Sequence, residues 1–135
     1  MNTDLRSIRA EEAMAKDIAW AEPHETARQA ALRMRERKVR ALLVRGAGPT
    51  DLPGILTSKD LVNLFGTQEV SALDVVTVAD VMTRPAICVG KDVHLVDCIN
   101  LMRMSSVRRL PVLDGTSVIG VLSSTDIFRR ALAEA

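Results

Sequence analysis

Apolar and polar positions in the second half of the chain change from strand spacing to helical spacing and back. Between Val93 and Ser105 the apolar residues recur every three or four positions, which predicts an amphipathic helix. The predicted strands are short apolar runs between turn residues, at 86–89, 109–113 and 117–122. A helical turn at 77–82 precedes the first strand, and a helix at 126–132 follows the last. The predicted order is therefore a helical turn followed by β-α-β-β-α.

The first half of the chain has the same order of elements. A turn near 11–14 comes first, a long helix is predicted at 25–37, and a final helix at 58–65. The predicted strands of this half are 18–21, 41–44 and 54–56. The long helices of the two halves have apolar faces formed by Ala27, Ala30, Ala31 and Met34 and by Leu95, Cys98, Ile99 and Met102.

Motifs recur as well as spacing. The sequence GILTSKDL at 54–61 returns as GVLSSTDI at 120–127, 66 positions later. This indicates a tandem repeat of a unit of roughly 55–60 residues, a size that is marginal for folding alone. We expect repeat 1 at 5–66, a linker at 67–75 and repeat 2 at 76–133. Hairpin strands should pair antiparallel and helix-connected strands parallel, which gives an α+β fold.

Composition and charge exclude several classes of protein. The net charge is +1, so no global field attracts nucleic acid or a membrane surface. No apolar run approaches the roughly 20 residues of a membrane span, and the first residues lack the apolar stretch of a signal peptide. We therefore expect a cytoplasmic protein that does not associate with membranes.

The few residues suited to metal or redox chemistry are scattered. Cys88 and Cys98 both lie in apolar segments, which favours two buried free thiols. His24 and His94 have no partner at metal-ligand spacing, so no metal site is expected. No catalytic triad, Cys/His pair or phosphate loop is recognisable. We expect a protein that is not an enzyme and has no covalent cofactor.

The best candidate chemistry lies where the last strand of each half turns into a helix. Ser123, Ser124 and Thr125 are at the first exposed N–H groups of a helix, where anions are favoured. The ionised Asp126 only accepts hydrogen bonds, which suits the two hydroxyls of a ribose. Ser or Thr followed by Asp is equally what a helix uses to cap its own N-terminus, and this alternative stays open.

Several motifs together resemble a known family. Thr57-x-x-Asp60 and Ser123-x-x-Asp126, VMTxP at 81–85 and RLPVLDG at 109–115 are similar to a tandem pair of CBS (cystathionine β-synthase) domains. The resemblance implies two β-α-β-β-α repeats packed sheet to sheet about a pseudo-twofold axis, with two clefts between them. Such modules commonly bind AMP, ADP, ATP, S-adenosylmethionine or sometimes NAD, and often form dimers.

The resemblance also implies roles for particular residues. The candidates for contacting ribose are Thr57, Asp60, Ser123 and Asp126. The candidates for contacting phosphate are Arg40, Lys59, Arg108, Arg109 and Thr125. The candidates for the adenine pocket are Ile18, Ala19, Ala86 and Ile87. The first repeat has Ala41 and Leu43 where the second has Arg109 and Pro111, so we expect unequal occupancy of the two clefts.

The resulting hypothesis is a small regulatory module that binds an adenosine-containing ligand and signals to an unidentified effector protein. A homodimer is expected, because two small repeats should leave apolar helix surface for a second chain. One alternative is a dimerisation scaffold without a ligand. Another is a nucleic-acid accessory protein that uses the basic helix at 28–40, whose cations are Arg28, Arg33, Arg35, Arg37, Lys38 and Arg40.

Overall fold

The computed structural model describes residues 4–133, which fall into two compact units. The first-repeat unit is Ala19–Ala86. The second-repeat unit combines Met1–Ile18 with Ile87–Ala135. The spatial units therefore cut across the predicted repeats, because each contains the first residues of the other repeat. We call these two opening segments, residues 5–18 and 76–86, the exchanged segments.

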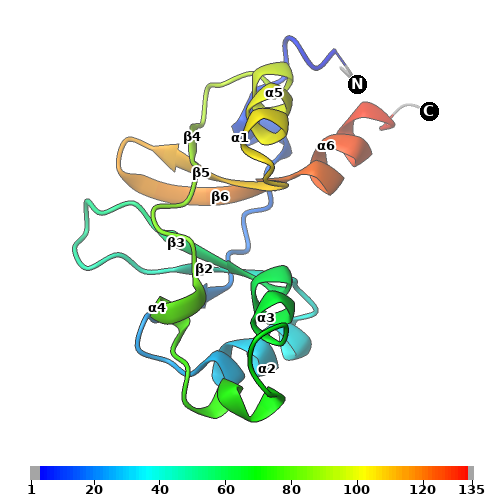
Figure 1. Ribbon diagram of the computed structural model, residues 1–135. Helices are drawn as coiled ribbons and strands as arrows, with labels where there is room; N and C mark the ends of the chain where they lie inside the picture. The colour runs from blue at the N-terminus through cyan, green and yellow to red at the C-terminus, as the bar shows by residue number, and fades with distance from the viewer. Residues whose placement is uncertain (1–3, 134–135) are drawn as a thin grey trace. The chain divides into compact units, whose positions relative to one another are not determined.

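The first-repeat unit contains a three-stranded sheet in the order β1-β2-β3 (Figure 1). Its strands are β1 Trp20–Ala21, β2 Ala41–Val44 and β3 Gly54–Thr57. Helix α2, Ala27–Arg37, connects β1 to β2, and these two strands pair parallel. Strands β2 and β3 form an antiparallel hairpin, and α3, Ser58–Leu64, follows directly. Both predicted pairings are confirmed.

The core of this unit lies between one face of the sheet and the two helices. Leu42, Val44 and Leu56 are completely buried on that face, against Met34 of α2 and Leu61 of α3. The segment expected to act as a linker adds to this core. It contains the short helix η1, Val70–Asp74, whose residues Ala72 and Leu73 are buried, and it leads into α4, Val78–Val81.

The second-repeat unit has the same plan. Strands β4 Val89–Gly90, β5 Arg109–Asp114 and β6 Ser117–Ser123 form its sheet, with β4 parallel and β6 antiparallel to β5. Its helices are α1 Ala10–Ala13, α5 Leu95–Ser105 and α6 Ser124–Ala131. The buried residues that join sheet and helices include Leu95, Leu110, Val112, Leu122 and Ile127. The α+β fold class is thus confirmed in both units.

Equivalent backbone hydrogen bonds attach the exchanged segments. The Ala10 N–H donates to the Val93 carbonyl at 2.7 Å in one unit. In the other unit, the Val78 N–H donates to the Glu25 carbonyl at 2.8 Å. Val78 corresponds to Ala10 and Glu25 to Val93, each at an offset of 68 residues. The same contact is therefore made twice, each time between an exchanged segment and the residues just before a long helix that is distant in sequence.

A glycine in each hairpin lets the exchanged segment cross a strand closely. Ala15 pairs with Val121 beside Gly120, and Thr83 pairs with Ile55 beside Gly54. A Cβ atom on Gly120 would lie 2.8 Å from the Ala15 carbonyl oxygen, whereas one on Gly54 would lie 3.1 Å from the Thr83 carbonyl oxygen. The crossing is tighter in the second-repeat unit.

Two local predictions are wrong. The strand predicted at 86–89 is reduced to Val89–Gly90, because the Ala86 N–H donates instead to the Pro53 carbonyl of the first-repeat unit. Cys88 is only half-buried, whereas Cys98 is fully buried, and the two cysteines are not joined by a disulfide. Burial raises the pKa of the Cys98 thiol to about 11, so this cysteine is protonated at neutral pH.

The apolar helix faces that we expected to leave for a second chain are part of the cores. Ala27, Ala30 and Met34 of α2 are buried, and so are Leu95, Cys98 and Met102 of α5. Ala31 and Ile99 pack partly buried against the same clusters. The expected docking surface is therefore wrong, because each sheet needs the whole apolar face of its own long helix. None of the helices in the described range is both long and apolar enough to cross a membrane.

Candidate ligand-binding site

The candidate ribose residues of the second repeat lie where β6 ends and α6 begins. Ser123 is the N-cap residue of α6, and its hydroxyl accepts a hydrogen bond from the Asp126 N–H at 3.1 Å. The Asp126 carboxylate accepts in return from the Ser123 N–H at 2.9 Å and from the Ser123 hydroxyl at 2.8 Å. This reciprocal arrangement is a capping box, so the structural alternative that the sequence left open is present in the geometry.

The first repeat has the same arrangement at the junction of β3 and α3. The Asp60 carboxylate accepts from the Thr57 N–H at 2.8 Å and from the Thr57 hydroxyl at 3.0 Å. In both boxes every one of these bonds goes to Oδ2 of the aspartate. Within residues 4–133, Oδ1 of Asp60 and Asp126 accepts no hydrogen bond. Each carboxylate therefore keeps one oxygen free for another donor.

A capping aspartate by itself does not define a site. Asp80 in α4 also accepts from a capping residue, the Thr77 N–H, at 3.0 Å, and this hydrogen bond lowers the pKa of Asp80. Asp80 is exposed, and no resemblance assigns it a ligand. Asp60 and Asp126 differ from Asp80 because other candidate binding residues lie near them in the fold.

The backbone of the candidate arginines of each unit lies beside these capping boxes. Arg109 is the first residue of β5 and pairs with Ser123 across the hairpin. The Ser124 N–H donates to the Arg108 carbonyl at 2.9 Å. In the first-repeat unit the Ser58 N–H donates to the Arg40 carbonyl at 2.9 Å, but Ala41 takes the place of Arg109. The exposed Thr125 and Lys59 lie in the first turns of α6 and α3.

The candidate adenine residues lie just before the first strand of each sheet, β1 or β4. Ala19 precedes β1, and its carbonyl accepts from the Leu43 N–H at 2.9 Å. Ala19 and Ala86 are buried, whereas Ile18 is half-buried and Ile87 is exposed. Of the four predicted residues, the two isoleucines therefore offer the larger apolar surface to a ligand.

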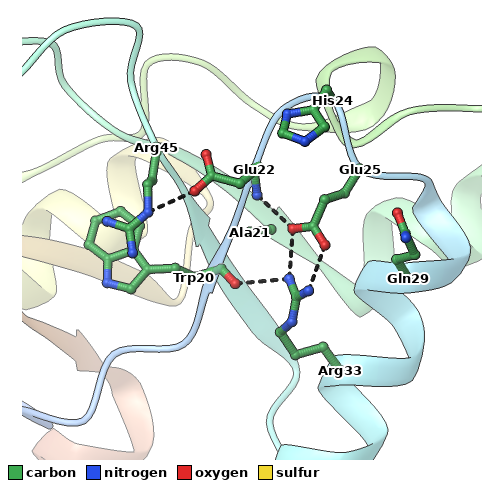
Figure 2. A pocket seen from close by; sticks show the side chains of 8 residues that line it. All are labelled: Trp20, Ala21, Glu22, His24, Glu25, Gln29, Arg33 and Arg45. Atoms are coloured by element: carbon green, nitrogen blue, oxygen red, sulfur yellow. Dashed lines mark hydrogen bonds and ion pairs between the residues drawn. The ribbon is translucent and has the colours of Figure 1, made fainter.

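A second cluster, at the opposite end of the first-repeat sheet, was missed by the sequence analysis. Where β1 and β2 end, a cavity of about 430 Å³ opens (Figure 2). It is lined by Trp20, Ala21, Glu22, His24, Glu25, Gln29, Arg33 and Arg45. The available signal was the only tryptophan of an aromatic-poor chain, followed closely by two glutamates.

Two ion pairs organise this cluster. Both terminal nitrogens of Arg33 donate to the Glu25 carboxylate, at 2.8 and 2.5 Å, and Arg33 also donates to the Trp20 carbonyl at 3.0 Å. The Arg33 contact holds the pKa of Glu25 at about 2. Arg45 pairs with Glu22 at 2.9 Å and lies 4.5 Å above the centre of the Trp20 ring. No group of three His, Cys, Asp or Glu side chains suited to a metal ion occurs among residues 4–133.

Comparison with known proteins identifies the family. The model of the CBS domain matches residues 10–66 and 78–133, which is most of the chain. The chain belongs to the CBS domain family. CBS-domain proteins are regulatory modules that commonly bind adenosine-containing ligands.

Three similar proteins illustrate the range of this family. The uncharacterized protein MK0525 of Methanopyrus kandleri is 32% identical over 93% of this chain and 63% of its own length. Inosine-5'-monophosphate dehydrogenase of Methanocaldococcus jannaschii is 28% identical over 90% of this chain, but the match covers 23% of that enzyme. The chain thus spans less than two thirds of both relatives. A hexameric CBS-CP12 protein from bloom-forming cyanobacteria superposes with a TM-score of 0.83 at 26% identity, over 92% of this chain and 71% of that one.

Proposed function

We propose that this chain is a regulatory module that binds an adenosine-containing ligand through Asp126 and, more weakly, through Asp60. The observation that carries the proposal is the free Oδ1 oxygen of each aspartate, beside arginines at the same end of the sheet. A capping box and a ribose contact do not compete for the same atom. The cap uses Oδ2 and fixes the side chain, and Oδ1 offers lone pairs to ribose hydroxyls.

The proposal assigns the tighter site to the second repeat. Arg108 and Arg109 supply two guanidinium groups there, whereas the first repeat supplies Arg40 alone. A guanidinium can bind phosphate with two parallel hydrogen bonds, so a second arginine favours phosphorylated ligands. In this proposal the chain is not an enzyme, acts in the cytoplasm and signals the bound ligand to an effector protein.

The experiment is calorimetry of AMP and adenosine binding to the parent and to Asp126→Ala. Loss of a hydrogen bond to a charged group should weaken binding by about 1.5–3 kcal/mol. Loss of the cap should lower the free energy of unfolding by only about 0.5–2 kcal/mol. Asp80→Ala is the matched control, because it removes a capping aspartate that has no proposed ligand. Unchanged affinity in a folded Asp126→Ala protein would reject the ribose contact.

Self-association is part of the same proposal, on a surface different from the one first expected. Val62 of α3 and Phe128 of α6 occupy equivalent positions 66 residues apart and are 63% and 66% exposed. Burial of such exposed apolar side chains against a second chain would favour association. The hexameric CBS-CP12 protein is an oligomeric relative. Light scattering that gives only the 14.7 kDa monomer would reject self-association.

The nucleic-acid alternative loses support from the ion pairs of α2. Arg28 forms an ion pair with Asp74, and Arg33 is bound to Glu25. Arg33 is one of the six cations of the basic helix at 28–40. Since its two terminal nitrogens already bind a carboxylate, it is not available to a phosphate backbone.

A further inference from the structure

The cavity of the first-repeat unit is separate from the proposed nucleotide site. Trp20 and Arg45 lie where β1 and β2 end, whereas Thr57 lies where β3 ends. Because β3 runs antiparallel to β2, its last residue is at the opposite end of the sheet and pairs with Ala41. A ligand in the cavity therefore contacts none of the residues assigned to ribose or phosphate.

One wall of the cavity is fixed. Both oxygens of Glu25 accept from Arg33, and Oε1 also accepts from the Glu22 N–H at 2.8 Å. The Glu25 side chain is 15% exposed. Both oxygens of Glu25 are engaged, and three of the five N–H groups of Arg33 have partners, which leaves the Nε–H and one N–H on Nη2 without a partner in the described chain. Most donors and both acceptor oxygens of this pair are thus already used, so the pair mainly shapes the site.

The other wall can change partners. The ion pair between Arg45 and Glu22 joins side chains that are 53% and 43% exposed, and pairs of this kind add little stability. The ion pair joins Nε of Arg45 to Glu22 at 2.9 Å. Within residues 4–133, the two terminal nitrogens of Arg45 have no hydrogen-bond partner. They leave N–H donors in the flat geometry that matches a carboxylate or a phosphate.

A further cation lies near this wall. Arg84, which does not line the cavity, donates to the Arg45 carbonyl at 2.7 Å. The lining itself has two guanidinium groups, Arg33 and Arg45, and two carboxylates, Glu22 and Glu25. The indole of Trp20 supplies apolar surface beside Arg45 and holds the guanidinium against its ring.

The fold itself does not require these charges. In the second-repeat unit the positions equivalent to Trp20, Arg33 and Arg45 are Cys88, Leu101 and Leu113, 68 residues later in the chain. Strand β4 nevertheless pairs with β5 in the same register as β1 with β2. The charged cluster is thus an addition to a scaffold that forms without it.

We propose that this cavity is a second ligand site, which binds a small organic carboxylate or phosphate through Arg45. The anion takes the two terminal nitrogens of Arg45, Glu22 turns into solvent, and the apolar part of the ligand lies against Trp20. A cavity of about 430 Å³ has room for a compact ring compound.

The test uses Trp20 as its own reporter, because it is the only tryptophan in the chain. The probes are benzoate and phenyl phosphate, with benzamide as the neutral counterpart of benzoate, measured by tryptophan fluorescence and by calorimetry. We expect saturable binding of at least one anion and binding of benzamide about tenfold weaker, since charge-assisted hydrogen bonds are the stronger ones. No saturable binding of either anion, or equal binding of benzamide, would overturn the proposal.

Three variants locate the site. Arg45→Leu, which introduces the residue found at Leu113, should abolish anion binding, and Glu22→Gln should strengthen it several-fold because the internal competitor loses its charge. Arg35→Leu removes the same charge from an exposed position of α2 outside the cavity and should leave binding unchanged. Binding that survives Arg45→Leu contradicts the proposal. The Asp126→Ala protein should bind the anions normally, so failure of the nucleotide proposal remains distinguishable from failure of this one.

Discussion

The two units differ in the residues beside the long helix, which are charged in the first-repeat unit and apolar in the second-repeat unit. In the first-repeat unit, Glu25 and Arg33 form a paired and partly buried charge cluster beside α2. In the second-repeat unit, the equivalent residues are Val93 and Leu101, which pack against an apolar core. Both solutions support the same sheet and the same long helix. The sheet and the long helix therefore do not require charged residues at this position.

Breaking one member of the charge pair should have the largest effect on stability. Arg33→Leu leaves the Glu25 carboxylate partly buried without its partner, and we expect the free energy of unfolding to fall by roughly 2–4 kcal/mol. Urea denaturation at neutral pH measures this loss.

The double variant Arg33→Leu, Glu25→Val imitates the second-repeat unit and is the control for this change. Since no unpaired charge remains, it should recover at least half of the lost stability. A double variant as unstable as Arg33→Leu would mean that the two units are not interchangeable at this position.

Acid should weaken the first-repeat unit through the same pair. Arg33 holds the pKa of Glu25 at about 2, below its ordinary value of 4.5. Because the folded pKa is the lower one, the stabilising contribution is complete above about pH 4.5 and is lost as the pH falls towards 2. We expect a loss of roughly 2–3 kcal/mol from this group.

Urea midpoints compared at about pH 5 and about pH 2.5 should show this loss in the parent protein. The double variant without Glu25 and Arg33 should respond less to the same change. An equal response of both proteins would assign the acid sensitivity to other carboxylates.

The two units also differ in how closely an exchanged segment approaches the hairpin glycine, Gly120 or Gly54. Gly120→Ala would force the backbone of Ala15 to move, because the new methyl group would lie 2.8 Å from its carbonyl oxygen. We expect a cost of about 1–3 kcal/mol, typical of overpacking. Gly54→Ala, with 3.1 Å to the Thr83 carbonyl oxygen, should cost less, about 1 kcal/mol. Thermal unfolding of the two variants checks the order, and a reversed order would contradict this account of the crossings.

The smallest expected effect concerns phosphate, and it rests on the proposed nucleotide site. Arg109→Ala should weaken AMP binding by about 1 kcal/mol and leave adenosine unaffected, because Arg108 still supplies one guanidinium. The AMP affinity of the parent should also fall as salt rises. Ala41→Arg makes the reciprocal change and should strengthen AMP binding at the first repeat. Calorimetry at low and high salt measures all three, and identical salt slopes for AMP and adenosine would remove the arginines from the site.

The sequence by itself determined the repeated local structure. The spacing of apolar residues predicted α2 and α5, and the hairpins and their pairing followed from the order of elements. The boundaries of β4 did not follow, because Ala86 bonds to Pro53 rather than to the sheet that its apolar neighbours suggested. Patterns between residues close in sequence carry information on propensity and periodicity, but none on which distant backbone group completes a strand.

The candidate site divides along the same line. The motifs Thr57-x-x-Asp60 and Ser123-x-x-Asp126 are local, so the sequence predicted both their place at a helix N-terminus and their possible capping role. Only the tertiary structure decided that Oδ1 stays free and that Arg33, which the sequence analysis named among the cations of a basic helix, binds Glu25. It also brought Arg45 over Trp20. These contacts depend on which strand ends and helix N-termini come together in the folded chain. Charge and periodicity within a short segment carry no information about such long-range contacts.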